Sequence, residues 1–137
     1  MKNLCCLLLL FALGLVTGLR GASACAPFRA DMAAGDAYAI DARRLHPTQF
    51  ALGWREVVAK RKKIDAKDVV ALDAYLRDKD VPVVIGPGGV PFMTDGHHTI
   101  RALLESKHAD KTVYGHVFAN WSALAPDEFW ARMRASN

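Results

Sequence analysis

The sequence predicts a small α/β (α+β) fold with one mixed sheet and about four helices. Short β-branched runs alternate along the chain with segments in which apolar residues recur at helical spacing. The 137 residues (15.0 kDa) have room for one domain. We find no internal repeat and no low-complexity tract. These limits exclude a multidomain machine, a polytopic membrane protein and a disulfide-stapled miniprotein.

The N-terminal block Leu4–Val16 is apolar and uncharged, yet shorter than the roughly 20 residues that a membrane-spanning helix needs. Lys2 precedes it and Ala22-Ser23-Ala24 follows it, which is the layout of a secretory signal with its cleavage site. We therefore expect a signal peptide at 1–24, export to the periplasm or the medium, and no transmembrane span after cleavage. Cys25 would be the first mature residue, and a lipid anchor on it is the alternative.

Charge is concentrated in one segment. The formal net charge of +4 falls to +2 when Lys2 and Arg20 leave with the signal. Between Arg43 and Lys67 the local charge is +6. A net charge this small does not argue for nucleic acid by itself, and a solvated helix face explains the basic segment equally well.

The mature chain begins with a stretch that lacks periodicity. Residues 25–37 are rich in Ala, Gly and Asp and predict a flexible leader, which leaves 38–135 for the domain. Tyr38–Ile40 predicts a first strand. His46–Gln49 predicts a turn, because the residue before a proline avoids helical geometry.

Two helices are expected next. Gly53–Ile64 predicts a helix with Trp54 on its inner face. Asp65 is expected to cap a second helix that runs to about Asp78, with Asp68 in its first turn. Apolar residues of the second helix recur at i, i+3 and i+4: Val69, Leu72, Tyr75 and Leu76.

The second half of the chain predicts a hairpin, a helix, a strand and a last helix. The β-branched run Val81–Ile85, the glycine-rich Gly86–Gly89 and Val90–Met93 predict strand, tight turn and strand. A helix is expected from Asp95-Gly96 to about Lys107.

Thr112–Phe118 alternates in a way that predicts a strand with both faces covered. Pro126-Asp127-Glu128 opens a last helix whose apolar stripe holds Phe129, Trp130 and Met133. We expect the three tryptophans of the chain in the core rather than on a ligand surface.

The segment Asp95-Gly96-His97-His98-Thr99-Ile100-Arg101-Ala102 lies at a predicted strand-to-helix junction. Free N–H groups and the dipole at a helix start favour an anion, and a glycine allows close approach to the backbone. Adjacent histidines can contact phosphate, move a proton or bind a metal, although two neighbours do not point the same way along a helix. An N-cap, a turn glycine and two surface histidines explain the segment equally well.

This glycine, basic pair and arginine-alanine box resembles that of the ParB/sulfiredoxin superfamily, and the wider chain resembles its small stand-alone branch, the ParB-like nucleases. The supporting segments occur in order over 38–134: Leu45–Gln49, Gly53, Glu56-Val57, Lys60, Tyr75-Leu76, Val81–Gly86, the box, and Phe129-Trp130. The resemblance implies a compact ParB/sulfiredoxin-like fold.

The resemblance also implies a nucleotide or nucleic-acid phosphate at the box, with nuclease or phosphoryl-transfer chemistry. It excludes the sulfiredoxin reaction, which needs a cysteine in the box. Thr99 stands where ParB proteins usually have an arginine, and it offers a hydroxyl donor but no charge. No helix-turn-helix region follows the box, so centromere binding of the partitioning kind is not expected.

His98 and Glu56 are the acid/base candidates. Asp95 offers an oxygen ligand to a divalent metal such as Mg²⁺. The alternative for Glu56 and Lys60 is a surface ion pair at i, i+4. The alternative function is a non-catalytic envelope module that binds a nucleotide, a phosphorylated ligand or a protein. The expected phosphate or ligand contacts are Gly96, His97, Thr99, Gln49, Lys60 and Arg101.

Overall fold

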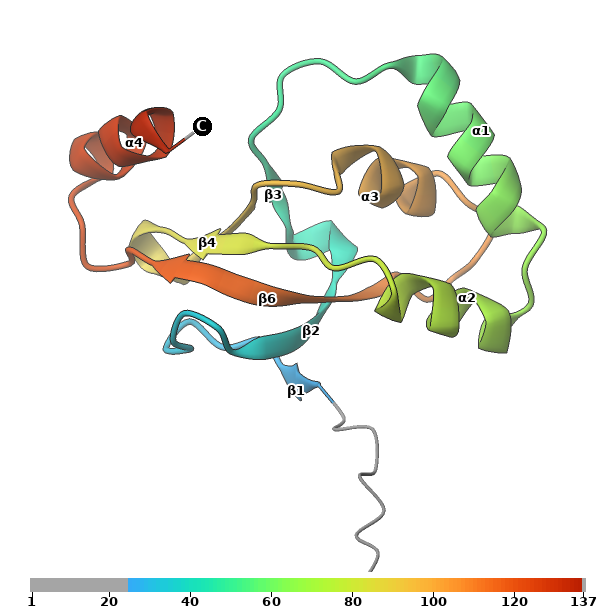
Figure 1. Cartoon of the computed structure of the whole chain (residues 1–137), viewed down its shortest axis with the longest axis horizontal. Helices are drawn as coiled ribbons and strands as arrows, with labels where there is room; N and C mark the ends of the chain where they lie inside the picture. Colours follow the sequence, from blue (N-terminus) through green and yellow to red (C-terminus); the bar gives the residue numbers. More distant parts are fainter. Residues whose placement is uncertain (1–24, 137) are drawn as a thin grey trace, which may run out of the picture.

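A six-stranded mixed sheet organises the chain, with strand order β1-β2-β6-β4-β5-β3 (Figure 1). The computed structural model describes residues 25–136, so the predicted signal peptide at 1–24 lies outside the described residues. The sheet and four α-helices confirm the predicted fold class. The strands are β1 (Ala26–Pro27), β2 (Ala37–Asp41), β3 (His46–Pro47), β4 (Val83–Ile85), β5 (Pro91–Met93) and β6 (Thr112–Asn120). The helices are α1 (Trp54–Asp65), α2 (Val69–Arg77), α3 (His97–Leu104) and α4 (Pro126–Ala135), with 3-10 turns η1 (Ala42–Arg44) and η2 (Pro87–Gly89).

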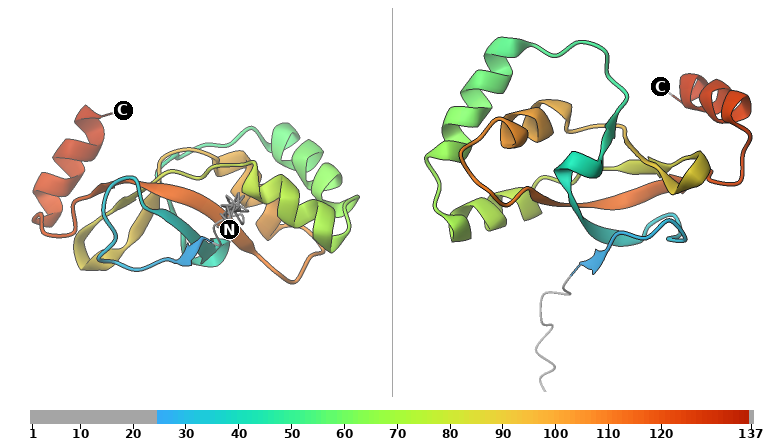
Figure 2. Two further views of the ribbon diagram at one scale, coloured as in Figure 1. Left: turned by 60° about the horizontal axis from the view of Figure 1, so that its bottom comes forward. Right: turned by 180° about the vertical axis from the view of Figure 1, so that it is seen from behind.

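Parallel and antiparallel pairings alternate across the sheet. β2 and β6, like β4 and β5, are antiparallel, whereas β1–β2, β4–β6 and β3–β5 are parallel. Helices α1, α2 and α3 gather at one end of the sheet, and α4 lies at the other end (Figures 1 and 2). The central strands connect these ends, because α2 leads into β4 and β6 leads out to α4. Within residues 25–136, no helix combines the length and apolarity needed to cross a bilayer.

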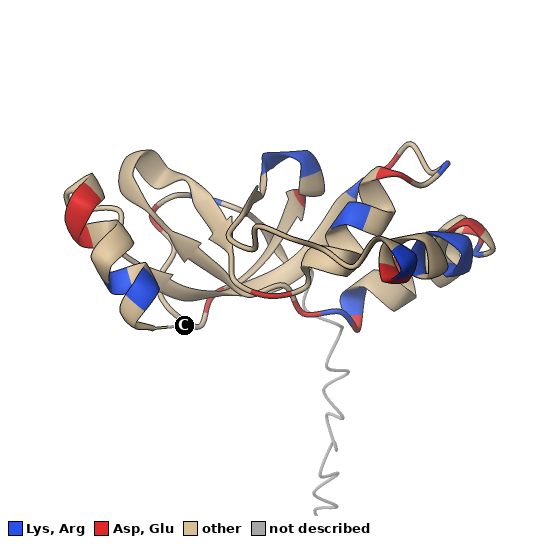
Figure 3. Cartoon of the chain, turned by 90° about the horizontal axis from the view of Figure 1, so that it is seen from above, with Lys and Arg blue, Asp and Glu red and all other residues tan. Residues whose placement is uncertain are grey.

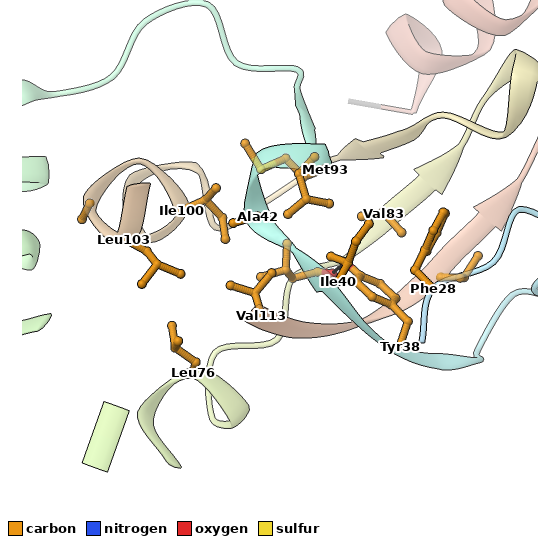
Figure 4. Close-up of a cluster of buried hydrophobic side chains, with 14 of the residues drawn as sticks. Phe28, Tyr38, Ile40, Ala42, Leu76, Val83, Met93, Ile100, Leu103 and Val113 are labelled. Carbon is orange, nitrogen blue, oxygen red and sulfur yellow. Dashed lines mark hydrogen bonds between the residues drawn. The ribbon is translucent and has the colours of Figure 1, made fainter. Parts of the chain in front are cut away.

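The main core lies between the sheet and the first three helices (Figure 4). Fully burying one such aliphatic or aromatic side chain contributes about 1.5–3 kcal/mol. Phe129 and Met133 of α4 form a second, smaller cluster with Val84. Buried members of the main core include Tyr38, Ile40, Val57, Ile64, Leu72, Leu76, Val83, Ile100, Leu103, Val113 and Val117.

The segment before β2 contributes to this core. Phe28 and Met32 are buried, and the Phe28 ring meets the Tyr38 ring edge-on with centroids 5.6 Å apart. The Phe28 N–H donates to the Ala39 carbonyl at 2.9 Å. Residues 25–37 therefore differ from the flexible leader that we expected. Two isolated apolar side chains among Ala and Gly produce no periodicity, which is why the sequence pattern missed them.

The boundary between α1 and α2 also differs from the prediction. Asp65 is the last residue of α1 instead of the cap of α2. The cap is Asp68, whose carboxylate accepts the Ala71 N–H at 2.8 Å. Asp65 and Asp68 are both residues that can cap a helix. Because α1 extends through Asp65, Asp68 caps α2.

Helix α3 ends at Leu104, short of the expected Lys107. The Leu103 carbonyl accepts the Ser106 hydroxyl at 2.7 Å and the Lys111 ammonium at 2.6 Å. Lys111 is itself buried, and burial lowers its pKa. A cation at the C-terminal end of a helix is stabilising, so these side chains satisfy the carbonyl groups where the helix stops.

Several large apolar side chains remain exposed. Phe118 on β6 is 56% exposed, because the β4–β6 register shifts by one residue there, as in a β-bulge. The expectation that both faces of β6 are covered is therefore wrong. Trp54 is 56% exposed and Trp130 41%, so these two tryptophans do not lie in the core.

At Gly115, the backbone of strand β6 lies directly against the backbone of Val81, in the segment that leads into β4. A Cβ at Gly115 would lie 2.0 Å from the Val81 carbonyl oxygen and 2.9 Å from the Tyr38 hydroxyl. The fully buried Tyr38 donates its hydroxyl to the Val81 carbonyl at 2.6 Å. Burial raises the pKa of Tyr38, which keeps this donor protonated. Residue 115 must therefore be glycine for Tyr38 and Val81 to meet.

We expect Gly115→Ala to lower the free energy of unfolding by about 3 kcal/mol, as for overpacking against backbone that cannot move aside. Urea denaturation followed by circular dichroism measures the change. Gly53→Ala is the matched control, because its Cβ would find no neighbour nearer than the His98 Nε2 at 3.8 Å. Equal stability of the two variants would contradict this account.

Candidate functional site

A cavity of about 360 Å³ opens where the start of α3 faces α1 and the segment between α2 and β4. Arg101 does not line it; its side chain is half-exposed and its guanidinium pairs with Glu105 one turn further along α3. The cavity brings together the other residues that the sequence predicted for the site: Gln49, Glu56, Lys60, Asp95, Gly96, His97, His98 and Thr99.

The start of α3 provides one wall of this cavity. Gly96 is the N-cap and has φ 80° and ψ 5°, a left-handed conformation that glycine adopts without strain. Its N–H donates to the Asp95 carboxylate at 2.6 Å. No side chain within residues 25–136 caps α3. The first-turn N–H groups, which lack helical acceptors, and the helix dipole therefore favour a negatively charged ligand here.

His97 turns away from this wall into the protein. It is only 5% exposed, and its Nε2 accepts the N–H groups of Thr48 at 3.1 Å and Gln49 at 3.3 Å. Two donors at Nε2 require a neutral ring with its proton on Nδ1. Burial lowers the pKa of His97 against the opposing charge of Asp95. His97 thus fastens the loop after β3 to α3, and the geometry favours this role over the phosphate contact that we predicted.

His98 points toward α1, where it meets two different partners. Its Nε2 accepts the Gly53 N–H at 3.2 Å and lies 3.5 Å from the Glu56 carboxylate. The same carboxylate lies 3.5 Å from the Lys60 ammonium. A neutral His98 can accept from Gly53, whereas a protonated one can only donate, and Glu56 is then the nearby acceptor. The structure therefore places the two predicted acid/base candidates in contact and also contains the alternative Glu56–Lys60 pair.

The segment between α2 and β4 adds residues that we did not predict for the site. Asp78, Lys79 and Asp80 all line the cavity. Lys79 lies 3.5 Å from the Asp78 carboxylate, and His116 on β6 lies 2.8 Å from the Asp80 carboxylate. The sequence signal was a run of four consecutive charged residues, Arg77 to Asp80, shortly before a buried strand, and such a run does not by itself indicate that they face a cavity.

The described residues do not form a ready metal centre. Within 25–136, no three His, Cys, Asp or Glu side chains are grouped closely enough to hold an ion. The Asp95 carboxylate already accepts the Gly96 N–H. Asp95 as a metal ligand therefore stays a prediction from the sequence.

Comparison with known proteins identifies the family. A family described as "Putative ParB-like nuclease" matches residues 38–137. The chain belongs to this family. The resemblance that we drew from the glycine-histidine box is thus confirmed, and the six-stranded sheet with four helices is consistent with the ParB/sulfiredoxin-like fold.

A solved structure, that of protein Atu1540 from Agrobacterium tumefaciens, matches this ParB-like chain with 35% sequence identity and a TM-score of 0.60. The match covers 74% of the present chain and 48% of that protein, so this chain spans about half the length of that relative. No curated protein matches the chain.

The basic segment predicted from the sequence lies mostly outside the cavity of this ParB-like domain. Arg43 and Arg44 belong to η1, and α1 displays Arg55, Lys62 and Lys63 on its exposed side (Figure 3). Within that segment, Lys60 is the basic residue that lines the cavity. Most of this charge therefore forms a solvated helix face, the simpler of the two explanations.

We expect His97 to make stability depend on pH. Its pKa is lowered in the folded chain, so below the unfolded value of about 6.5 the unfolded state binds the extra proton. The stability contributed by neutral His97 is complete above that pH and is lost as the pH falls below it. Urea denaturation at pH 7 and pH 5 should show a smaller loss for His97→Gln, which keeps an acceptor without titrating.

His46→Gln is the control, because it makes the same substitution at an exposed histidine outside this contact. Identical pH dependence of wild type and His97→Gln would show that the loop is held in another way.

Proposed function

We propose that this ParB-like domain acts on a phosphate-containing substrate, a nucleotide or a nucleic acid, as a nuclease or a related phosphoryl-transfer enzyme. The observation that supports it is one cavity in which His98, Glu56 and Lys60 lie beside the uncapped start of α3. Membership of the family supports nuclease chemistry without naming a substrate.

The cavity contains a suitable chemical group for each part of such a reaction. A phosphate oxygen would accept the N–H groups from His97 to Thr99, which the missing side chain of Gly96 leaves open to approach, and Lys60 would supply charge as it leaves Glu56. Gln49 adds an amide donor at the rim. As water attacks phosphorus and the bond to the leaving oxygen breaks, the water proton passes to the neutral Nε2 of His98. The leaving oxygen takes a proton from solvent.

The two partners of His98 fit this role. Before the reaction its Nε2 accepts from Gly53; after taking a proton, it can donate to the Glu56 carboxylate 3.5 Å away. Glu56 then stabilises the imidazolium, so the donor partner that Nε2 loses at Gly53 is replaced by an acceptor partner at Glu56.

A divalent metal remains a proposal from the sequence. Mg²⁺ is often held by one or two carboxylates together with substrate phosphates, and Asp95 offers such a carboxylate next to the phosphate wall. No step above depends on it. Assays in the presence of Mg²⁺, Mn²⁺ or a chelator decide whether activity requires a metal.

A non-catalytic module that binds a nucleotide, a phosphorylated ligand or a protein is the second candidate. Two observations support this second candidate. Both lysines that line the cavity are already paired with carboxylates, and residues 25–136 contain no cluster of three side chains that could hold a metal ion. Thermal unfolding in the presence of nucleotides separates the two functions. A rise in the melting temperature without product formation would support binding alone.

We also propose that the chain is exported after removal of residues 1–24, with acylation of Cys25 as the alternative. The apolar block and the Ala22-Ser23-Ala24 sequence support it. Mass spectrometry of the protein recovered from bacterial envelope and medium tests it: a free Cys25 N-terminus supports cleavage, a lipid-modified one supports the anchor, and an intact Met1 contradicts both.

We expect the wild-type protein to hydrolyse DNA or a nucleotide, and His98→Ala to slow the reaction by about 10²–10⁴-fold, the usual contribution of a general acid or base. Glu56→Gln should give a smaller loss, because it removes only the group that stabilises the protonated ring. Initial rates with a labelled oligonucleotide over a metal panel measure both.

The matched control is His46→Ala, since His46 is exposed and lies outside the cavity. Full activity of His98→Ala would remove the proposed roles. An inactive wild type over the whole metal panel would leave the binding module as the better account.

A further inference from the structure

We infer that the substrate is a single-stranded nucleic acid and that an aromatic groove beside the cavity binds one of its bases. This inference rests on the proposed function, because it extends the same site. It starts from a second hollow of about 470 Å³, between the loop after β3 and the exposed side of α4. The C-terminal end of α4 points toward that loop (Figures 1 and 2).

The walls of the groove are apolar and include two exposed aromatic rings. Phe50 is fully exposed on the loop, and Trp130 on α4 is 41% exposed. Pro47 and Met133 complete the apolar lining. Exposed aromatic side chains that face a shared groove are costly in water unless a ligand covers them.

The two rings are supported in different ways. Trp130 packs edge-on against Phe92 and Phe129, with ring centroids 5.2 Å and 5.0 Å apart, which fixes its orientation. Phe50 follows directly after Gln49, whose N–H is held by His97. A fixed indole opposite a ring on an anchored loop suits the flat face of a base, and every base has such a face.

The groove adjoins the cavity proposed to hold phosphate. Gln49 lines both hollows, and a further hollow between them is bordered by Thr48, Phe50 and His97. A phosphate in the cavity therefore places the neighbouring nucleotide at the groove. In a duplex the bases are paired and stacked inside, so only an unpaired strand can offer a base here.

Charge at the far end of the groove matches a nucleic-acid backbone. Arg134 lines the groove, and Arg132 lies two residues before it in the last turn of α4, so positive charge gathers at this end of the helix (Figure 3). A groove that combines aromatic rings with a cation is typical of sites for single strands. An apolar protein segment would use the rings but would have no use for Arg134 or for the link to the cavity.

Binding of a labelled oligothymidine and of an abasic oligonucleotide of the same length tests the inference. Both probes carry the same phosphates, but only the first has bases. We expect the wild type to bind oligothymidine more tightly, and Phe50→Ala to weaken that binding by about tenfold while leaving abasic binding unchanged. Phe50 is fully exposed, so its removal does not threaten folding.

Phe118→Ala is the matched control, because Phe118 is another exposed aromatic residue and does not line the groove. It should bind both probes as the wild type does. Arg134→Ala should reduce the salt dependence of binding by about 0.7 in the logarithmic slope, the value for one contact with a single strand. Equal binding of the two probes by the wild type, or unchanged binding of oligothymidine by Phe50→Ala, would overturn the inference.

Cleavage assays separate this result from the proposed function. Hydrolysis of the abasic strand that depends on His98 but shows no preference for bases would overturn the aromatic groove and leave the phosphate chemistry standing. Absence of binding and cleavage with both probes would overturn the inference and the nucleic-acid form of the proposed function; absence of hydrolysis of nucleotides as well would overturn the proposed function itself. Absence of binding to both probes is also the result expected if the groove binds an apolar segment of a protein.

Discussion

The close approach of the chain at Gly115 holds the core and the cavity together. Because residue 115 has no side chain, Tyr38 can bind the Val81 carbonyl, and the Val81 N–H can reach the Tyr114 carbonyl at 3.1 Å. Val81 also lines the cavity beside Gly96, where an added Cβ would lie 3.6 Å from the Val81 side chain. The close approach at Gly115 thus sets the position of Val81, a residue of the cavity wall next to the start of α3.

The two neighbouring histidines, His97 and His98, have different surroundings. Successive residues of an α-helix point about 100° apart, so one ring of the pair can enter the core while the next faces α1. His97 is buried and neutral and orders the loop that carries Gln49 and Phe50. His98 keeps a partner for each of its protonation states. A pair of adjacent histidines therefore suits this junction better than it would suit a metal centre.

Sequence periodicity predicted the helices and the central strands well, because their apolar faces pack against one core. It failed where a single tertiary contact, rather than a repeating pattern, determines the local structure. His46-Pro47 was predicted as a turn, yet pairs with β5 as a short strand; Phe28 and Met32 have no periodic neighbours. The box at the start of α3 was predictable from Gly96 and the histidines that follow. Asp80 and Phe50 were not, because only the tertiary fold brings them to the cavity and the groove.

The charges around the cavity explain how it can accept an anion although carboxylates outnumber lysines in its lining. Glu56, Asp78 and Asp80 are each paired with Lys60, Lys79 and His116, respectively. The fourth carboxylate, Asp95, accepts the Gly96 N–H. In the proposed reaction an incoming phosphate would exchange with Glu56 for Lys60, a cation already in place. The exchange frees Glu56 to receive a protonated His98. In the proposed mechanism, binding of the anion would therefore prepare the group that stabilises the base after proton transfer, and Lys60 would link substrate binding to catalysis.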